Sequence, residues 1–170
     1  MAVRIVTDST ADIPLERAQA LGITVVPLTV FFGDEAYLDG VELDNSSFYR
    51  KLQASKVSPR TSQPPPGSFQ EAFTRLIKEG ADAILSVHLS AKLSGTYQSA
   101  CTGRDSLPEE LKKIPFDIVD SQSVSLGMSA AIMRAAEEAR QGLGLERSKR
   151  TCLIRFRAHT SCSHLIPWNI

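Results

Sequence analysis

Short apolar segments and helix-type patterns alternate along the chain. Residues 3–7 and 23–26 are short runs rich in β-branched side chains, and each is bounded by turn-forming residues, as strands are. Residues 83–89, with the sequence AILSVHL, form a nearly continuous apolar run, which is typical of a strand covered on both faces of a parallel sheet. Residues 116–119 predict one more strand, which ends at Asp120.

Three helices with clear patterns are predicted between and after these strands, and the small polar residues at 90–99 are predicted to lead into a fourth. The first begins near Pro14 and stops at Gly22, and the third is the alanine-rich segment 128–140. The second carries apolar side chains at offsets of four, seven and eight residues, which place them on one helix face: Phe69, Phe73, Leu76 and Ile77. Because strands and helices alternate, the sequence predicts an α/β fold with a mainly parallel β-sheet flanked by helices.

Residues 28–66 interrupt this alternation. Residues 28–32 continue extended beyond Pro27, and the turn-forming pairs 33–34 and 39–40 bracket Tyr37, which predicts a small hairpin. Asn45 and the two serines after it are predicted to cap a short helix. The polar segment 55–66 is expected to be a long loop.

Charge and length narrow the class of protein. The 170 residues suffice for one globular domain, and 19 basic and 19 acidic residues leave no net charge. Without a basic field the chain is not expected to bind nucleic acid. The first eight residues are too short for a signal-peptide core or a membrane span, so we expect a soluble cytoplasmic protein.

The cysteines suggest neither a disulfide framework nor a metal site. Cys101, Cys152 and Cys162 are an odd number without close pairing, which favours reduced thiols. With His159 and His164 the last two cysteines fit no structural-zinc spacing. We therefore expect neither a metal nor a cofactor.

Polar clusters follow three of the predicted strands, at residues 8–10, 90–96 and 120–123. In an open parallel sheet, ligands bind beyond the carboxyl ends of the strands, where these turns would meet. Hydroxyls and backbone amides near helix starts suit an anion such as a carboxylate or phosphate. The segment 60–67 adds hydroxyls on a backbone that its prolines restrict.

Five motifs occur in an order that resembles the DegV family of fatty-acid-binding proteins. The two most characteristic are Thr61-Ser62-Gln63-Pro64 and LSGTYQSA at residues 93–100. The others are TDSTAD at 7–12, YLDGV at 37–41, and the segment 119–127. Each motif alone is weak, but together they span roughly residues 3 to 150 and match the first lobe of that family.

The resemblance implies a bacterial carrier that holds a long-chain fatty acid, such as palmitate, by its carboxylate. Hydroxyls matching Thr61 and Ser94 would bind the carboxylate, and the neighbouring Ser62 and Gly95 would add a hydroxyl and an amide. A separate fatty-acid kinase would phosphorylate the presented acid, so the chain itself would not be an enzyme. By the same resemblance the remaining polar residues of these turns fix the backbone: Asp8, Ser9, Ser121 and Ser125.

Other functions remain open at this point. Ser94, His88 and Asp120 would be the nucleophile, base and acid of a serine hydrolase, although no Gly-x-Ser-x-Gly motif surrounds Ser94. A phosphate-binding module would use the Ser94-Gly95-Thr96 turn, which lacks a following lysine. Within its apolar strand, His88 is predicted to be a hydrogen-bonded core residue rather than a base.

The carboxyl-terminal segment departs from the DegV pattern. Residues 1–158 are predicted to form a DegV-like lobe, and residues 159–170 an atypical tail. Family members continue into a second lobe, which we expect to be absent here, as a frameshift or premature stop would leave it.

Overall fold

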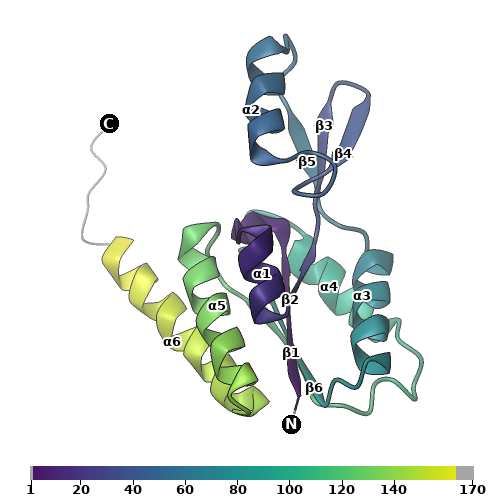
Figure 1. Ribbon diagram of the computed structural model, residues 1–170, viewed down its shortest axis with the longest axis vertical. Coiled ribbons are helices and arrows are strands. Elements are labelled where there is room, and N and C mark those ends of the chain that lie inside the picture. Colours follow the sequence, from purple (N-terminus) through teal and green to yellow (C-terminus); the bar gives the residue numbers. More distant parts are fainter. Residues whose placement is uncertain (1, 164–170) are drawn as a thin grey trace.

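A computed structural model describes residues 2–163, with side chains described as far as Phe156 (Figure 1). Its central sheet has four parallel strands in the order β2-β1-β6-β7. They are β1 (Val3–Asp8), β2 (Ile23–Val26), β6 (Ala83–His88) and β7 (Phe116–Asp120). The predicted α/β fold with a mainly parallel sheet is confirmed.

Helices cover both faces of this sheet (Figure 1). On one face lie α1 (Leu15–Leu21), α5 (Leu126–Arg140) and α6 (Leu145–Ser163). On the other lie α3 (Pro66–Lys78) and α4 (Thr96–Asp105). Side chains of a strand alternate between faces, so Ile5 and Leu85 pack toward α5 while Val6 and Ile84 pack toward α3. Two apolar cores therefore sandwich the sheet.

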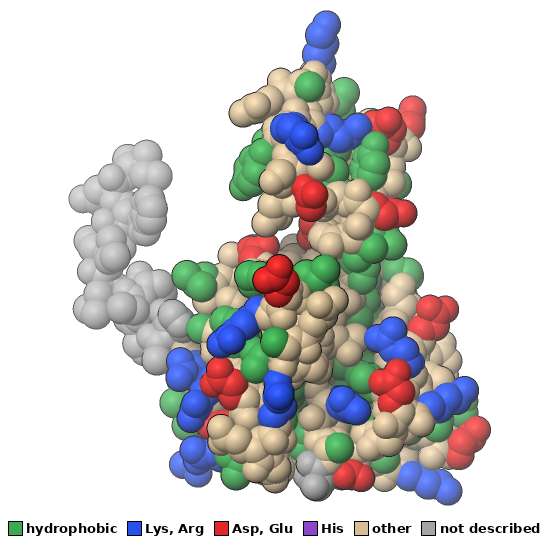
Figure 2. All heavy atoms as spheres, viewed as in Figure 1, with side chains coloured by type: hydrophobic (Ala, Val, Ile, Leu, Met, Phe, Trp, Pro, Cys, Tyr) green, Lys and Arg blue, Asp and Glu red, His purple; other side chains and the backbone are tan. Residues whose placement is uncertain are grey.

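A second, smaller unit rises above the body of the molecule (Figures 1 and 2). Its antiparallel sheet has the order β4-β3-β5 and consists of β3 (Thr29–Phe32), β4 (Glu35–Leu38) and β5 (Arg60–Ser62). The helix α2 (Asn45–Ala54) completes it, around a small core of Val30, Phe32, Leu43, Tyr37 and Phe48. The chain enters this unit after β2 and leaves it before α3, so two short segments join it to the body.

The hairpin prediction for this unit is confirmed, and two details differ. Residues 60–62 are not loop but an edge strand, paired with β3 through backbone hydrogen bonds. The N-cap of α2 is Asp44 rather than Asn45, since its carboxylate accepts the Ser47 N–H at 2.7 Å. That same hydrogen bond lowers the pKa of Asp44.

A buried carboxylate joins α5 to α6. Glu138 accepts a hydrogen bond from the Thr151 hydroxyl at 2.6 Å and lies 3.6 and 3.8 Å from the guanidinium groups of Arg134 and Arg147. The predicted boundary at residue 158 stays a prediction, because α6 runs on through Ser163 and residues 164–170 of the expected tail lie outside the described residues. Within the described part of the chain, no helix combines the length and apolar character needed to cross a bilayer.

Cysteine reactivity follows from burial. Cys152 is fully buried between α5 and α6, and this burial raises the pKa of its thiol to about 12, whereas Cys101 is partly exposed. At pH 8 such a pKa leaves about one thiol in ten thousand ionised, and only the thiolate reacts quickly. We expect iodoacetamide at pH 8 to modify Cys101 and to spare Cys152 until guanidinium unfolds the protein. Peptide mass spectrometry measures both sites, and equal modification of the two in the native protein would contradict this packing.

Candidate functional site

The three polar clusters meet at the carboxyl edge of the parallel sheet, as predicted. The Ala91 N–H donates to Asp120 Oδ1 at 3.1 Å, and the Ser90 N–H donates to the carbonyl of Ser123 at 2.9 Å, which joins the turns after β6 and β7. The Ser125 N–H donates to the carbonyl of Thr10 at 2.8 Å, which joins the turns after β7 and β1. These bonds make one continuous polar edge.

Ser94 and Gly95 lie in the turn that leads into α4. The Ser94 N–H donates to the Ser90 carbonyl at 3.2 Å, and Gly95 is the N-cap of the helix. The Ser94 hydroxyl lies 2.9 Å from that of Thr96, which is fully buried. With the Thr96 hydroxyl as donor, the partly exposed Ser94 keeps its own proton for an outside acceptor. Because anions bind readily at helix N-termini, this turn suits a carboxylate.

Thr61 and Ser62 lie in β5 of the small unit, and both are exposed. Their Cα atoms pair with those of Val30 and Thr29 in β3. Adjacent residues of a strand point to opposite faces, so their two hydroxyls lie on opposite sides of β5. A single small anion would therefore bind one of these hydroxyls directly and not both.

The segment after β5 lies against the turn that begins α4. A Cβ atom added to Gly95 would overlap the side-chain amide of Gln63, with the Gln63 Cδ only 2.9 Å away. The Ser99 hydroxyl donates to the carbonyl of Pro64 at 2.5 Å. The structure thus brings together the two segments that carry the four candidate residues. The sequence did not reveal the role of Gln63, although it stands in the motif at 61–64.

His88 has partners that the sequence did not identify. Its Nδ1 lies 3.0 Å from Asp8 Oδ2 and its Nε2 lies 2.7 Å from the Ser86 hydroxyl, and all three side chains are fully buried. The prediction of a hydrogen-bonded core histidine is confirmed. Burial keeps substrates away from Ser86, so this trio is not an accessible hydrolase site.

The hydrolase interpretation of Ser94, His88 and Asp120 is wrong. Asp120 accepts hydrogen bonds from the backbone amides of Ala91 and Gln122, at 3.1 and 2.9 Å, while His88 bonds to other residues. The carboxylate that contacts His88 comes from β1, far away in the sequence.

The residues expected to fix the turns do so. Ser9 Oγ accepts the Leu28 N–H at 3.1 Å, and Asp8 caps the short turn that follows β1. Ser121 Oγ accepts the Ser123 N–H at 3.2 Å. Ser125 has a positive φ of 53°, which a non-glycine residue adopts only where neighbouring contacts impose it.

Exposed apolar side chains border this polar edge. They lie at the starts of α1 and α5 and in the turns after β6 and β7, and they are Leu15, Leu126, Leu93 and Val124. Their exposed fractions are 65%, 74%, 68% and 43%. We call these four residues the apolar rim. Polar groups that suit an anion and apolar surface that suits a hydrocarbon therefore share one edge of the molecule.

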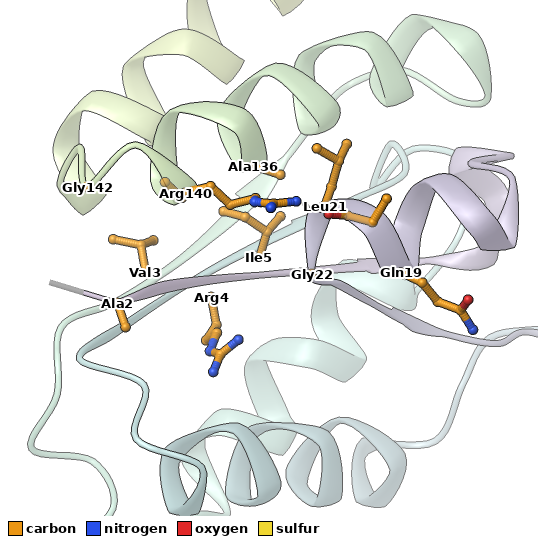
Figure 3. A pocket seen from close by; sticks show the side chains of 12 residues that line it. Ala2, Val3, Arg4, Ile5, Gln19, Leu21, Gly22, Ala136, Arg140 and Gly142 are labelled. Atoms are coloured by element: carbon orange, nitrogen blue, oxygen red, sulfur yellow. Dashed lines mark hydrogen bonds between the residues drawn. The ribbon is translucent and has the colours of Figure 1, made fainter.

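A pocket of about 590 Å³ lies at the opposite end of the sheet, beside the amino ends of β1 and β2 (Figure 3). In Figure 3, Arg4 and Arg140 point to opposite sides of β1, and Arg140 donates a hydrogen bond to the carbonyl of Ala20. Their charges therefore do not converge on one ligand. The described residues that line this pocket include none of the four candidates.

Metal chemistry finds no support in the described part of the chain. Among the side chains that the structure describes, up to Phe156, no three of His, Cys, Asp or Glu are grouped as metal ligands would be. Charged side chains of both signs are mixed over the face in Figure 2. Of the residues weighed for a zinc site, His164 lies outside the described residues, and the side chains of His159 and Cys162 are not described.

Comparisons with known proteins agree with the fold. A family model described as uncharacterised protein, DegV family, matches residues 2–162. A DegV domain-containing protein of Halalkalibacterium halodurans is 51% identical over 115 residues, which are 68% of this chain and 40% of that protein. One from Clostridium perfringens is 34% identical over 157 residues, or 92% of this chain and 54% of that protein. The chain spans about half the length of the curated relatives it matches.

Several proteins of known structure to which this chain is similar are described as binding fatty acids. A fatty-acid-binding DegV family protein from Thermus thermophilus superposes with a TM-score of 0.80 at 36% identity, covering 92% of this chain and 54% of that one. DegV from Bacillus subtilis, described as a fatty acid binding protein, gives a TM-score of 0.83 at 32% identity with the same coverage. A stearic acid-binding protein from Eubacterium ventriosum gives 0.80 at 25% identity, covering 88% and 52%.

Proposed function

The chain belongs to the DegV family, and from that premise we propose that it binds a long-chain fatty acid by its carboxylate and presents it to a fatty-acid kinase. The observation that carries this proposal is the likeness to solved DegV proteins, at 36% and 32% identity, that are described as fatty-acid-binding. The polar edge with its adjoining apolar rim supports the same ligand class.

Thr61 and Ser94 are the proposed direct ligands of the carboxylate. Close packing of Gln63 against Gly95 supports the approach of their two segments, and with the buried Thr96 hydroxyl as donor the Ser94 proton stays available. Gly95 precedes the first turn of α4, so its backbone N–H lies where a helix favours an anion. Ser62 takes a secondary place, because its hydroxyl faces away from that of Thr61.

The acyl tail is proposed to contact the apolar rim. A hydrogen bond to a charged group contributes about 1.5 to 3 kcal/mol, which about two to four buried methylenes, at roughly 0.8 kcal/mol each, would match. Most of the affinity for a long acid such as palmitate should therefore come from the tail. The hydroxyls then select the acid end and fix its orientation.

The proposed role is that of a carrier and not of a catalyst. The candidate head-group residues offer three hydroxyls and one backbone amide, and His88, the only histidine whose side chain is described, is fully buried. Such a site can orient and desolvate a carboxylate. Phosphorylation would need a nucleotide-binding partner, here a fatty-acid kinase.

The first experiment is mass spectrometry of an organic extract of the purified protein, followed by calorimetric titration of the delipidated protein with palmitate. We expect a co-purified fatty acid and saturable binding, with hexadecanol, which has the same chain length but no carboxylate, binding more weakly. Inorganic phosphate, titrated in parallel, tests the alternative of a small-anion module. An empty extract together with no binding of palmitate or stearate would contradict the proposal.

Presentation is tested by adding ATP and a bacterial fatty-acid kinase to the loaded protein. Acyl phosphate should form only with the kinase present. Consumption of ATP by this chain alone would contradict its role as a carrier.

A further inference from the structure

One buried carboxylate joins two strand ends beneath the candidate site. Asp8 Oδ1 accepts the Thr10 N–H at 3.1 Å and the Thr10 hydroxyl at 2.5 Å. Asp8 Oδ2 accepts His88 Nδ1–H at 3.0 Å and the Leu89 N–H at 3.2 Å. A single side chain at the end of β1 therefore anchors the turn that follows β1 and the turn that follows β6.

The imidazole of His88 is held from the other sides as well. A carboxylate can only accept, so Nδ1 carries the proton that faces Asp8, and in the neutral imidazole Nε2 is then the acceptor for the Ser86 hydroxyl at 2.7 Å. The Phe69 ring stands edge-on to the imidazole, with centroids 4.9 Å apart and an interplanar angle of 77°. Each polar atom of the ring is satisfied, and no ligand reaches it, because its exposed fraction is zero.

A first series of contacts connects the Asp8–His88 pair to Thr61; we call it the first arm. Ser9, directly after Asp8, accepts the Leu28 N–H at 3.1 Å, at the point where the chain passes from the parallel sheet into the small unit. The next residues form β3, in which Val30 pairs with Thr61. The turn after β1 thus sets where the small unit, and with it β5, stands on the body.

A second series of contacts, the second arm, connects His88 to Ser94. Ser90, two residues after His88, accepts the Leu93 and Ser94 N–H groups at 2.9 and 3.2 Å. Asp8 binds the backbone N–H of Leu89, and the next residue, Ser90, anchors the turn that presents the Ser94 hydroxyl. Both series of contacts therefore begin at the hydrogen-bonded pair of Asp8 and His88.

We propose that Asp8 and His88 are positioning residues that hold the Thr61 and Ser94 segments in register for the carboxylate, although neither touches it. The identity of the ligand in this inference rests on the proposed function. The connection from Asp8 and His88 to the two segments rests on the hydrogen bonds described above. A buried polar pair that only stabilised the fold would leave the spacing of the two arms unchanged. If the pair positions the two segments, a substitution in it lowers ligand affinity more than a substitution elsewhere that costs the same stability. If the pair only stabilises the fold, the two substitutions affect affinity equally.

The test compares two substitutions at His88 with a matched control in the same strand. His88→Phe keeps a planar aromatic ring, somewhat larger than the imidazole, and removes both hydrogen bonds, while His88→Asn retains a donor that can face Asp8. Val87→Ala, also fully buried in β6 but packed against the opposite core, lowers stability without touching the pair. Palmitate affinity is measured by calorimetry well below the Tm of each variant. We expect His88→Phe to weaken binding about tenfold, the size of one weakened hydrogen bond to a charged group. His88→Asn should recover part of that loss, and Val87→Ala should bind as the wild type does.

A second readout does not need the ligand. Amide hydrogen exchange followed by NMR should show faster exchange at Ser94 and Leu28 in His88→Phe, and unchanged exchange there in Val87→Ala. Faster exchange without any palmitate binding by the wild type would overturn the proposed function and leave the positioning role standing. Wild-type affinity and wild-type exchange in His88→Phe would overturn the positioning role. Equal losses of palmitate affinity in His88→Phe and Val87→Ala would also overturn the positioning role.

Discussion

Replacing Thr61 and Ser94 together by alanine is expected to weaken palmitate binding by roughly a hundredfold to ten-thousandfold. Each hydroxyl would lose one hydrogen bond to a charged group, at about 1.5 to 3 kcal/mol, and every 1.4 kcal/mol changes affinity about tenfold. Thr61 is exposed and Ser94 is only partly buried, so the fold should persist. Calorimetry of the delipidated double variant measures the loss, and thermal unfolding confirms that the variant is folded.

Two controls sharpen this experiment. Ser62→Ala removes a neighbouring hydroxyl on the opposite side of β5, so its effect on affinity should be small. Hexadecanol should bind the wild type and the double variant with similar affinity, because it offers no carboxylate to either hydroxyl. Wild-type affinity for palmitate in the double variant would remove both residues from the head-group role.

Replacing Phe69 by alanine should lower the free energy of unfolding by about 3 to 5 kcal/mol, the usual range for a fully buried phenylalanine. Its ring packs on Phe73 with centroids 6.0 Å apart, and it meets His88 edge-on. Its Cβ also closes against α4, since a Cβ atom added to Gly103 would lie only 2.8 Å from it. The substitution would leave a cavity between α3, α4 and the sheet.

Urea unfolding at equilibrium measures this loss. Tyr49→Ala is a suitable control, because Tyr49 is also aromatic but is 63% exposed, and surface changes usually stay within about 0.5 kcal/mol. A loss below about 1 kcal/mol for Phe69→Ala would mean that the core collapses around the missing ring more completely than such sites usually do.

The central sheet was predictable because its signals are local and strong. The run at residues 83–89 is almost entirely apolar and becomes the fully buried β6. The helix at 66–78 was found from the spacing of Phe69, Phe73 and Leu76, which all face the core. In these segments burial decides the structure, and burial leaves a pattern in the sequence.

The strand β5 was missed because its structure has no such cause. Arg60, Thr61 and Ser62 are all exposed, so no apolar alternation marks them. What makes them a strand is backbone pairing with β3, which lies about thirty residues earlier along the chain. Hydrogen bonds of the main chain are indifferent to side-chain type, and the sequence of an edge strand can therefore resemble that of a loop.

The sequence indicated where the polar segments of the candidate site would meet, but it did not indicate which residues connect them. Polar residues after each strand mark the carboxyl edge, and the order of the motifs singles out Thr61 and Ser94. The sequence also places His88 in an apolar strand, but its partner Asp8 comes from β1. Likewise, the packing of Gln63 on Gly95 joins segments that only the folded chain brings together.

The neighbouring strands β1 and β6 are made at very different times. Paired residues in the two strands are 80 positions apart, so a ribosome adding about 5 to 20 residues per second completes β6 roughly 4 to 16 s after β1. During that interval β1 has β2 as its only available neighbour in the sheet, and Ile5 and Val6 lack the strand that later covers one side of them. Contacts between such distant parts of a chain form slowly, and an open apolar strand edge attracts other chains. Strand β1 is therefore enclosed on its second side only after β6 has been made, and until then that side is open to pairing with other chains.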